Sequence, residues 1–439
     1  MSEAGTAASP DLIEKAIGLS RYLTSTPGIG GRLKLDPESF RVDEISRYPL
    51  PEDNGKITIA RVEAWDIEQN ELLRRLTRAL SLRPGSIGIA GTKDRRAVTT
   101  QLISIPAAEE KVRGLSLSGV RVLEAYRASE SLYLGALYGN RFEIAVHEMH
   151  QGSEETISRL KATEKELRES GGFPNYFGPQ RFGEVRPVTH LVGRALVLGS
   201  AKEAVETYLT AHAEGEMPDG SSARADYASH HDPARALKEF PQQLGFERIL
   251  LDRLARGDEP ERAFQALPRY LKTLFVHAYQ SYLFNRFLSM RMDSGLGLSE
   301  PVEGDWLIRH GPDGLPGKMP PVPVKEENIE EARRSLLTGR ARLSAPIVGT
   351  DTPSSTGAPG ALMEKLLAEE GVKRENFHLN FFPELSSAGT FRGMLAPMPL
   401  SVYARGAPVV DEEKVTFCFC LEKGEYATVL LREFMKGHT

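Results

Sequence analysis

The pattern of hydrophobic and polar positions divides the 439 residues into three parts. Up to about residue 150, short runs of alternating apolar and polar residues dominate, which is typical of β-strands. Two stretches, 10–21 and 67–82, instead carry apolar residues at helical spacing. The expected strands are 40–45, 56–64, 86–90, 99–105, 118–126, 132–138 and 140–147. This mixture predicts an α+β domain around a mixed or antiparallel sheet rather than a regular βαβ series.

The middle of the chain has a different character. A helix expected at 154–169 ends at the turn cluster 171–174, which we interpret as a hinge. From there to about residue 385 the pattern predicts long amphipathic helices. The clearest of them are 187–212, 246–256 and 267–292. The last part returns to a strand at 414–421 and a helix at 425–434, so the order of elements predicts one domain interrupted by another.

Composition narrows the class of protein. The net charge of -5 does not favour nucleic-acid binding, so an RNA partner would require a local basic surface. The sequence has no run of about 18 apolar residues, and we therefore expect no membrane span. Its first ten residues are small and polar, which predicts a loose tail rather than a signal peptide.

The two cysteines, Cys418 and Cys420, lie within one alternating apolar run. This spacing places both side chains on one face of a strand and suits neither a disulfide nor a zinc pair. We therefore expect ordinary strand residues, no metal site and a reducing, cytoplasmic location.

The segment 91–96, Gly-Thr-Lys-Asp-Arg-Arg, presents one carboxylate among three cations. We expect Gly91 to let the backbone turn sharply, and the cations to keep Asp94 ionised, as a carboxylate nucleophile requires. A structural acid that caps a turn beside solvated cations fits the same pattern, and charge spacing alone slightly favours it. Two other classes fit poorly, because glycoside hydrolysis needs a second acid and the glycine spacing does not match a Walker loop.

Two further segments carry candidate binding residues. The segment 175–183 combines three aromatic residues with amides and an arginine, so it could stack on bases, bind phosphate through Arg181 or lock a hinge. Asn140 and Phe142 alternate on an expected strand and therefore face the same side. An amide beside an aromatic ring can hold a planar base, although core packing would also explain Phe142.

Together, the segments 90–101, 135–142 and 175–183 resemble the TruD family of tRNA pseudouridine synthases. Supporting matches occur at 33–44 and at 424–433. Several long motifs in the right order make the resemblance specific, and it extends over nearly the whole chain. The stretch between about 200 and 360 carries few family motifs and looks more like archaeal or eukaryotic members than compact bacterial ones.

The resemblance implies an isomerase that converts uridine to pseudouridine in tRNA without a cofactor, at uridine 13 of the D-arm. Asp94 matches the catalytic aspartate, which would act as the nucleophile, and Lys34 matches its basic partner. Asn140 and Phe142 match residues that hold the target base. The other expected substrate-binding residues are Arg95, Arg96, Asn175, Phe177, Gln180 and Arg181. Base flipping would bring the uridine to Asp94.

The implied fold is an α+β pseudouridine synthase domain with a mixed or antiparallel sheet, interrupted by an inserted α+β TRUD domain. We expect the catalytic domain at 1–172 and 393–439 and the insertion at 173–392, with 175–183 as a hinge that lines a cleft. A monomer with a tRNA partner is expected. Other structured RNAs are an alternative target. A non-catalytic RNA-binding protein or chaperone is an alternative class, disfavoured because a binding module has no need of Asp94.

Overall fold

The computed structural model describes residues 10–47, 49–149, 151–213, 215–311, 315, 317, 319–411 and 414–437. Apart from Pro10, the expected loose tail lies outside the described residues. The chain forms two compact units. The first contains the described parts of Thr24–Glu169 and Pro397–Thr439, and the second contains those of Ser9–Leu23 and Ser170–Ala396. Both units are therefore discontinuous in sequence.

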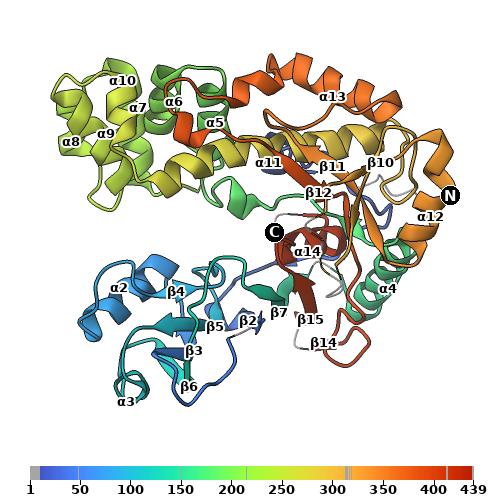
Figure 1. The fold of residues 1–439 in the computed structure, drawn as a ribbon, viewed down its shortest axis with the longest axis horizontal. Coiled ribbons are helices and arrows are strands. Elements are labelled where there is room, and N and C mark those ends of the chain that lie inside the picture. Colours follow the sequence, from blue (N-terminus) through green and yellow to red (C-terminus); the bar gives the residue numbers. More distant parts are fainter. Residues whose placement is uncertain are drawn as a thin grey trace. The chain divides into compact units, whose positions relative to one another are not determined.

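The first unit is built on one large sheet (Figure 1). Its strands are β1 (Gly30–Arg32), β2 (Phe40–Ser46), β3 (Ile57–Trp65), β4 (Gly88–Ile89), β5 (Val98–Ile105), β6 (Val120–Ala128), β7 (Leu137–Met149), β14 (Val410–Asp411) and β15 (Lys414–Glu422). Their order is β14-β15-β7-β2-β5-β3-β6, with β1 beside β7 and β4 beside β5. Among these described strands only β2 and β5 pair in parallel, and the other pairs are antiparallel. The sheet is thus mixed, as expected.

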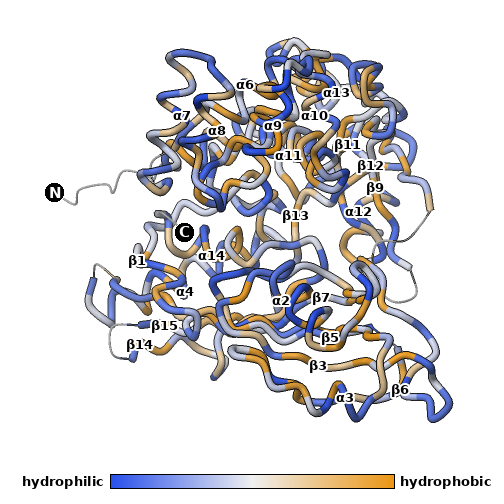
Figure 2. The backbone as a smooth tube through the Cα atoms, turned by 90° about the vertical axis from the view of Figure 1, so that its left-hand side faces the viewer, coloured by the Kyte–Doolittle hydropathy of each residue, from blue (hydrophilic) through white to orange (hydrophobic). Residues whose placement is uncertain are grey.

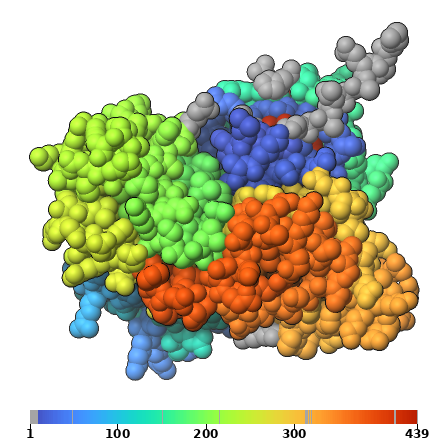
Figure 3. Space-filling view, turned by 90° about the horizontal axis from the view of Figure 1, so that it is seen from above, coloured from blue at the N-terminus to red at the C-terminus, as the bar shows by residue number. Residues whose placement is uncertain are grey.

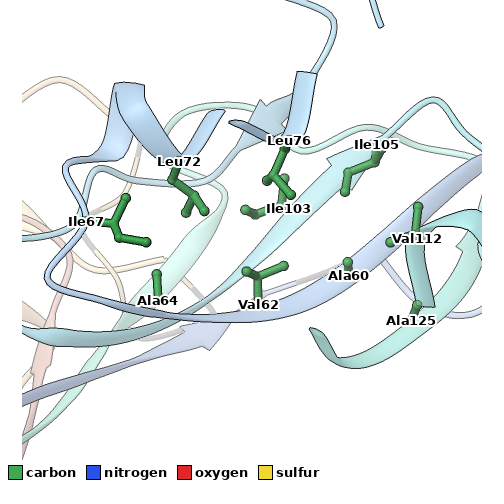
Figure 4. Packing of buried hydrophobic residues seen from close by; sticks show 10 residues of the cluster. All are labelled: Ala60, Val62, Ala64, Ile67, Leu72, Leu76, Ile103, Ile105, Val112 and Ala125. Carbon is green, nitrogen blue, oxygen red and sulfur yellow. The ribbon is translucent and has the colours of Figure 1, made fainter. Parts of the chain in front are cut away.

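Hydrophobic residues on one face of this sheet hold helices against it. The helices of the first unit are α2 (Gln69–Ala79), α3 (Glu109–Arg113), α4 (Ser153–Glu169) and α14 (Ala427–Met435). Leu72 and Leu76 of α2, four residues apart, and Val112 of α3 belong to one buried cluster with Val62 and Ile103 (Figure 4). Figure 2 shows hydrophobic residues along β3 and β5, the strands beneath α2. Each fully buried aliphatic side chain contributes roughly 1.5–3 kcal/mol, so this layer anchors the strands that carry the site.

The second unit consists mainly of helices. They are α1 (Leu12–Ala16), α5 (Thr189–Val197), α6 (Ala201–Thr210), α7 (Pro218–His230), α8 (Pro233–Glu239), α9 (Gly245–Ala255), α10 (Pro260–Gln265), α11 (Arg269–Asp293), α12 (Ile329–Leu337) and α13 (Gly357–Glu370). The long helix α11 packs closely on α5, because a Cβ on Gly193 would lie 2.0 Å from the Phe275 carbonyl oxygen. Arg194 of α5 pairs with Glu370 of α13. Figure 3 shows the green α5 region beside the orange α13 region.

A small sheet completes the second unit and corrects one expectation. Its strands are β9 (Trp306–Arg309), β10 (Val322–Pro323), β11 (Ala341–Ile347) and β12 (Thr390–Gly393), in the antiparallel order β10-β9-β11-β12. A separate pair joins β8 (Phe173–Pro174) to β13 (Leu395–Ala396). The helical pattern expected up to residue 385 missed the sheet, because β11 is buried almost throughout and β9 and β10 are too short to show a period.

Other expected elements also differ from the structure. The helix expected at 187–212 is divided into α5 and α6, because the chain turns at Gly199 with φ +83°, and the strand expected at 86–90 is only β4. The helix expected at 10–21 is only α1, since the chain turns at Gly18 with φ +85°. The two strands expected at 132–138 and 140–147 form the single strand β7, which begins at Leu137. No described helix is long and apolar enough to cross a membrane.

Candidate active site

The loop between β4 and β5 carries Asp94. Lys34, from the segment between β1 and β2, places its Nζ 3.4 Å from Asp94 Oδ1. The Lys34 side chain is 10% exposed and that of Asp94 is 26% exposed. The lysine is therefore largely shielded from water while the carboxylate stays accessible, and the two charges interact more strongly than an exposed surface pair.

The loop that carries Asp94 lies near the point on β5 where pairing with β2 ends and pairing with β4 begins. β3 occupies one edge of β5 along its whole length, so β2 and β4 share the other edge. β2 pairs with residues 98–100 and β4 with residues 103–104. Glu44 follows Asp43, the last residue of β2 that pairs with β5, and its Oε1 accepts a hydrogen bond from the Leu102 N–H at 3.4 Å. The Glu44 carboxylate thus serves a backbone group of β5 in the gap between the two shorter pairings.

The cations near Asp94 are arranged differently from the expected cluster. Lys93 Nζ lies 2.7 Å from Glu44 Oε2, and the two side chains are only 4% and 1% exposed. A carboxylate buried this deeply needs a cationic partner, which explains why Lys93 pairs with Glu44. Arg95 and Arg96 are exposed. Asp94 forms its ion pair with Lys34, which is distant in sequence, while the adjacent lysine turns to Glu44.

The backbone of the site corrects a second expectation. Gly91 does not adopt a left-handed φ, and the nearest atom to an added Cβ, Lys93 Nζ, would lie 3.5 Å away. The turn before Asp94 therefore does not require glycine. Lys34 has a φ of 54°, a left-handed conformation that side chains with a Cβ rarely adopt.

One aromatic ring borders Lys34, and further rings and an amide lie on the neighbouring strands β7 and β15. Lys34 Nζ lies 4.9 Å from the centre of the Phe40 ring, which lies 6.4 Å from the Phe142 ring. The Phe142 ring in turn lies 5.6 Å from that of Phe419 on β15. Asn140, two positions before Phe142 on β7, has a buried Oδ1 without a hydrogen-bond partner among the described residues. Because buried acceptors are rarely left unsatisfied, this oxygen is suited to a donor from a ligand.

The segment 175–183 lies in the second unit. Asn175 is buried, and its amide accepts a hydrogen bond from Arg392 and donates one to the Gly393 carbonyl oxygen. The Arg392 guanidinium lies 4.2 Å from the centre of the Phe177 ring, and the Phe177 N–H donates to Asn285. These contacts give Asn175 and Phe177 a supporting role within the unit.

Gln180 and Arg181 follow in the same segment and are partly exposed. Arg181 Nε donates to Ser281 Oγ of α11 at 3.2 Å, and its guanidinium lies 5.9 Å from the Phe177 ring. The segment is thus fixed to α11 while part of each of these two side chains remains accessible.

Two residues at the site were not singled out from the sequence, Glu44 and Phe419. Glu44 showed one possible signal, since it is an acid at a position that the period of β2 assigns to the buried face. Phe419 showed none, because its pairing with Phe142 depends on the register between distant strands.

The structure and the sequence of this chain both match known proteins over nearly their whole length. A crystal structure described as tRNA pseudouridine synthase D (TruD) from Methanosarcina mazei matches with a TM-score of 0.81 at 38% identity, over 97% of this chain and 98% of that one. The fold is therefore that of a pseudouridine synthase, a class of isomerases. The family's sequence model, tRNA pseudouridine synthase D (TruD), matches residues 16–434.

Curated relatives agree with this assignment. A probable tRNA pseudouridine synthase D from Methanosarcina mazei is 38% identical over 97% of both chains. Another from Pyrococcus furiosus is 38% identical over 96% of this chain and 99% of the relative. The chain belongs to the TruD family, and the resemblance inferred from its motifs is confirmed.

Proposed function

We propose that this enzyme isomerises uridine 13 in the D-arm of tRNA to pseudouridine. The observation that carries the proposal is the Lys34–Asp94 pair, with the Phe40 ring beside Lys34. The adjacent strand β7 carries Phe142 next to Phe40 and a buried Asn140 oxygen without a partner among the described residues. The relatives are named for tRNA. Position 13 follows from the family resemblance alone.

Asp94 supplies the carboxylate that starts the reaction. It either attacks C1′ of the ribose or removes the C2′ proton, which returns later, and both routes break the bond between N1 and C1′. The freed uracil keeps the bonding electrons, turns, and bonds to C1′ through C5. The C5 proton is then lost and N1 gains one. Substrate and product contain the same atoms, so the reaction needs no co-reactant.

Asn140 and Phe142 hold the uracil during this turn. Uracil presents an N3–H donor between two carbonyl acceptors, and an amide side chain offers both an acceptor and donors. The buried Oδ1 of Asn140 can accept the N3–H. Phe142 and Phe419 provide an apolar wall that excludes water from the base. Flipping the uridine out of its stack costs a few kcal/mol, least where the base is weakly paired.

The remaining expected residues have separate roles in this proposal. Arg95 and Arg96 contact the RNA backbone, and Gln180 and Arg181 bind substrate from the second unit. Asn175 and Phe177 act indirectly by holding that segment in shape. We assign the catalytic domain to 1–172 and 393–439 and the inserted domain to 173–392. The two compact units differ from these bounds, since Ser9–Leu23 and 393–396 belong to the second unit. The enzyme acts as a monomer in the cytoplasm, where its two free cysteines remain reduced.

The proposal is tested with tRNA transcripts labelled with tritium at uracil C5. The enzyme should release about one equivalent of tritium per tRNA, because the C5 proton is lost once per isomerisation. A transcript with cytidine at position 13 should release almost none. Equal release from that transcript would exclude position 13, and release from other structured RNAs instead would favour the broader target. Binding without any release would favour a non-catalytic RNA-binding protein.

A further inference from the structure

Glu44 and Lys93 form a buried ion pair directly next to Asp94 in sequence. Their charged atoms lie 2.7 Å apart, and neither side chain is more than 4% exposed. The two charged groups already bind each other, and Glu44 also accepts the Leu102 N–H, so we assign neither of them a contact to the flipped uridine. We infer that the pair consists of positioning residues, which set the place of the Asp94 carboxylate relative to the target base. The inference deepens the proposed function and rests on it.

Glu44 fixes the loop to the sheet at a gap in the pairing along one edge of β5. Neither the β2 nor the β4 pairing extends to residues 101 and 102 of β5. Glu44 Oε1 accepts the Leu102 N–H in this gap, while Oε2 binds Lys93. One carboxylate therefore connects the framework of the sheet to the residue that precedes Asp94.

Glu44 also lies next to Asn140, one of the residues proposed to hold the base. In the antiparallel register of β2 and β7, Glu44 is directly opposite Asn140. Opposite residues on such a pair share a face, with Cβ atoms about 4.5–5.5 Å apart. Glu44 thus has the catalytic loop on one side and the amide proposed to hold uracil on the other. A shift of its carboxylate would change the distance between Asp94 and the base.

The experiment measures the rate of the reaction and the affinity for tRNA in Glu44→Gln. This substitution keeps the shape of the side chain and removes its charge. Single-turnover tritium release should slow about 10- to 100-fold, because small misplacement of a reacting group carries a cost of this size. The Kd for tRNA should stay within about two-fold, since the buried group does not touch RNA. A variant with an altered Kd and an unchanged rate would overturn the inference.

A double variant separates positioning from stability. Glu44→Gln leaves a buried ammonium without its carboxylate, which lowers the melting temperature. Glu44→Gln combined with Lys93→Met contains no unpaired buried charge, so it should regain most of the melting temperature but not the rate. Recovery of both would show that the pair only stabilises the fold. This variant carries the test if the single variant fails to fold.

Glu63→Gln is the matched control. Glu63 lies on β3 of the same sheet, its side chain is 6% exposed, and it pairs with Arg121 at 2.6 Å. Its replacement should lower the melting temperature and leave the single-turnover rate unchanged. An equal decrease of rate in Glu44→Gln and Glu63→Gln would contradict the inference. Wild type and Asp94→Ala, assayed in parallel, show separately whether the proposed function itself holds.

Discussion

At the scale of single residues, Lys34 combines an unusual backbone with the contact to Asp94. Its φ of 54° lies in the left-handed region, where a residue with a Cβ loses roughly 1–2 kcal/mol. Strained conformations of this kind persist where the surrounding structure holds them, and they concentrate at functional sites. The conformation places an ammonium group both 3.4 Å from Asp94 and over the Phe40 ring.

Two substitutions of Lys34 separate this strain from chemistry. Lys34→Ala and Lys34→Gly both remove the ammonium group, so both should lose most of the tritium-release activity. Only glycine relieves the left-handed backbone, and Lys34→Gly should therefore be more stable than Lys34→Ala by about 1 kcal/mol in urea unfolding. Equal stability of the two variants would show that the backbone at Lys34 is not strained.

His190 makes the stability of the second unit depend on pH. The imidazole is 3% exposed between the rings of Phe182 and Tyr282, and burial lowers its pKa to about 4. Below about pH 6.5 the imidazole is protonated in the unfolded chain but stays neutral in the folded protein. The unfolding free energy therefore decreases as the pH falls from about 6.5 toward 4. The cost reaches roughly 2 kcal/mol at pH 5.

Urea unfolding at pH 7 and pH 5 measures this effect. The difference in unfolding free energy between the two pH values should be smaller in His190→Gln than in wild type, because glutamine does not titrate. His212, which is exposed in the same unit, supplies the control variant His212→Gln. An identical pH dependence in wild type and His190→Gln would contradict this account.

At the scale of elements, α11 organises the second unit through its polar residues. Asn285 donates hydrogen bonds to the carbonyl oxygens of Ile17 and Phe177, and Ser289 donates to that of Gly18. These side chains tie the Ser9–Leu23 stretch and the 175–183 segment to one helix. Near its end, Arg291 binds both oxygens of Asp305, at 2.6 Å and 2.9 Å.

The Arg291–Asp305 pair gives a stability prediction. The two side chains are 0% and 2% exposed, so Asp305→Ala leaves a buried guanidinium without its partner. This change should reduce the unfolding free energy by about 3–5 kcal/mol. Asp293, also on α11, forms an exposed ion pair with Arg21. Asp293→Ala should therefore reduce the unfolding free energy by less than about 1 kcal/mol. Chemical denaturation of both variants checks the contrast, and similar decreases would contradict it.

The sequence predicted elements with a clear period better than contacts between distant segments. The spacing of Leu72 and Leu76 indicated α2, and alternation around Val42 indicated β2. The hydrophobic pattern missed the small sheet, since burial on both faces removes alternation from β11, and only the α+β insertion implied by the resemblance anticipated it. At the site, the motif around Asp94 was visible in the sequence, but the pairing of Lys93 with Glu44 depends on how the loop folds over the sheet.

At the scale of the whole molecule, the net charge of -5 means that RNA binding must rely on local basic groups. Arg95 and Arg96 are exposed next to Asp94 and are our candidates for phosphate contacts. Each contact to a phosphate releases bound counterions and makes affinity fall as salt rises.

The salt dependence of tRNA binding tests these contacts. The double variant Arg95→Ala/Arg96→Ala should bind tRNA more weakly at low salt. The plot of the logarithm of the association constant against the logarithm of salt concentration should become less steep, by about 1 for each arginine that binds a phosphate. Lys161→Ala and Lys165→Ala, on the exposed side of α4, provide a charge-matched control. An unchanged slope in the arginine variant would exclude both residues from the RNA backbone contacts.

The central claim is that the Asp94 carboxylate performs the chemistry. The most direct measurement is tritium release from C5-labelled tRNA by wild type and Asp94→Ala, with tRNA binding measured on the same preparations. We predict that Asp94→Ala binds tRNA with nearly unchanged affinity and releases no tritium above background. Release by Asp94→Ala at the wild-type rate would contradict the account.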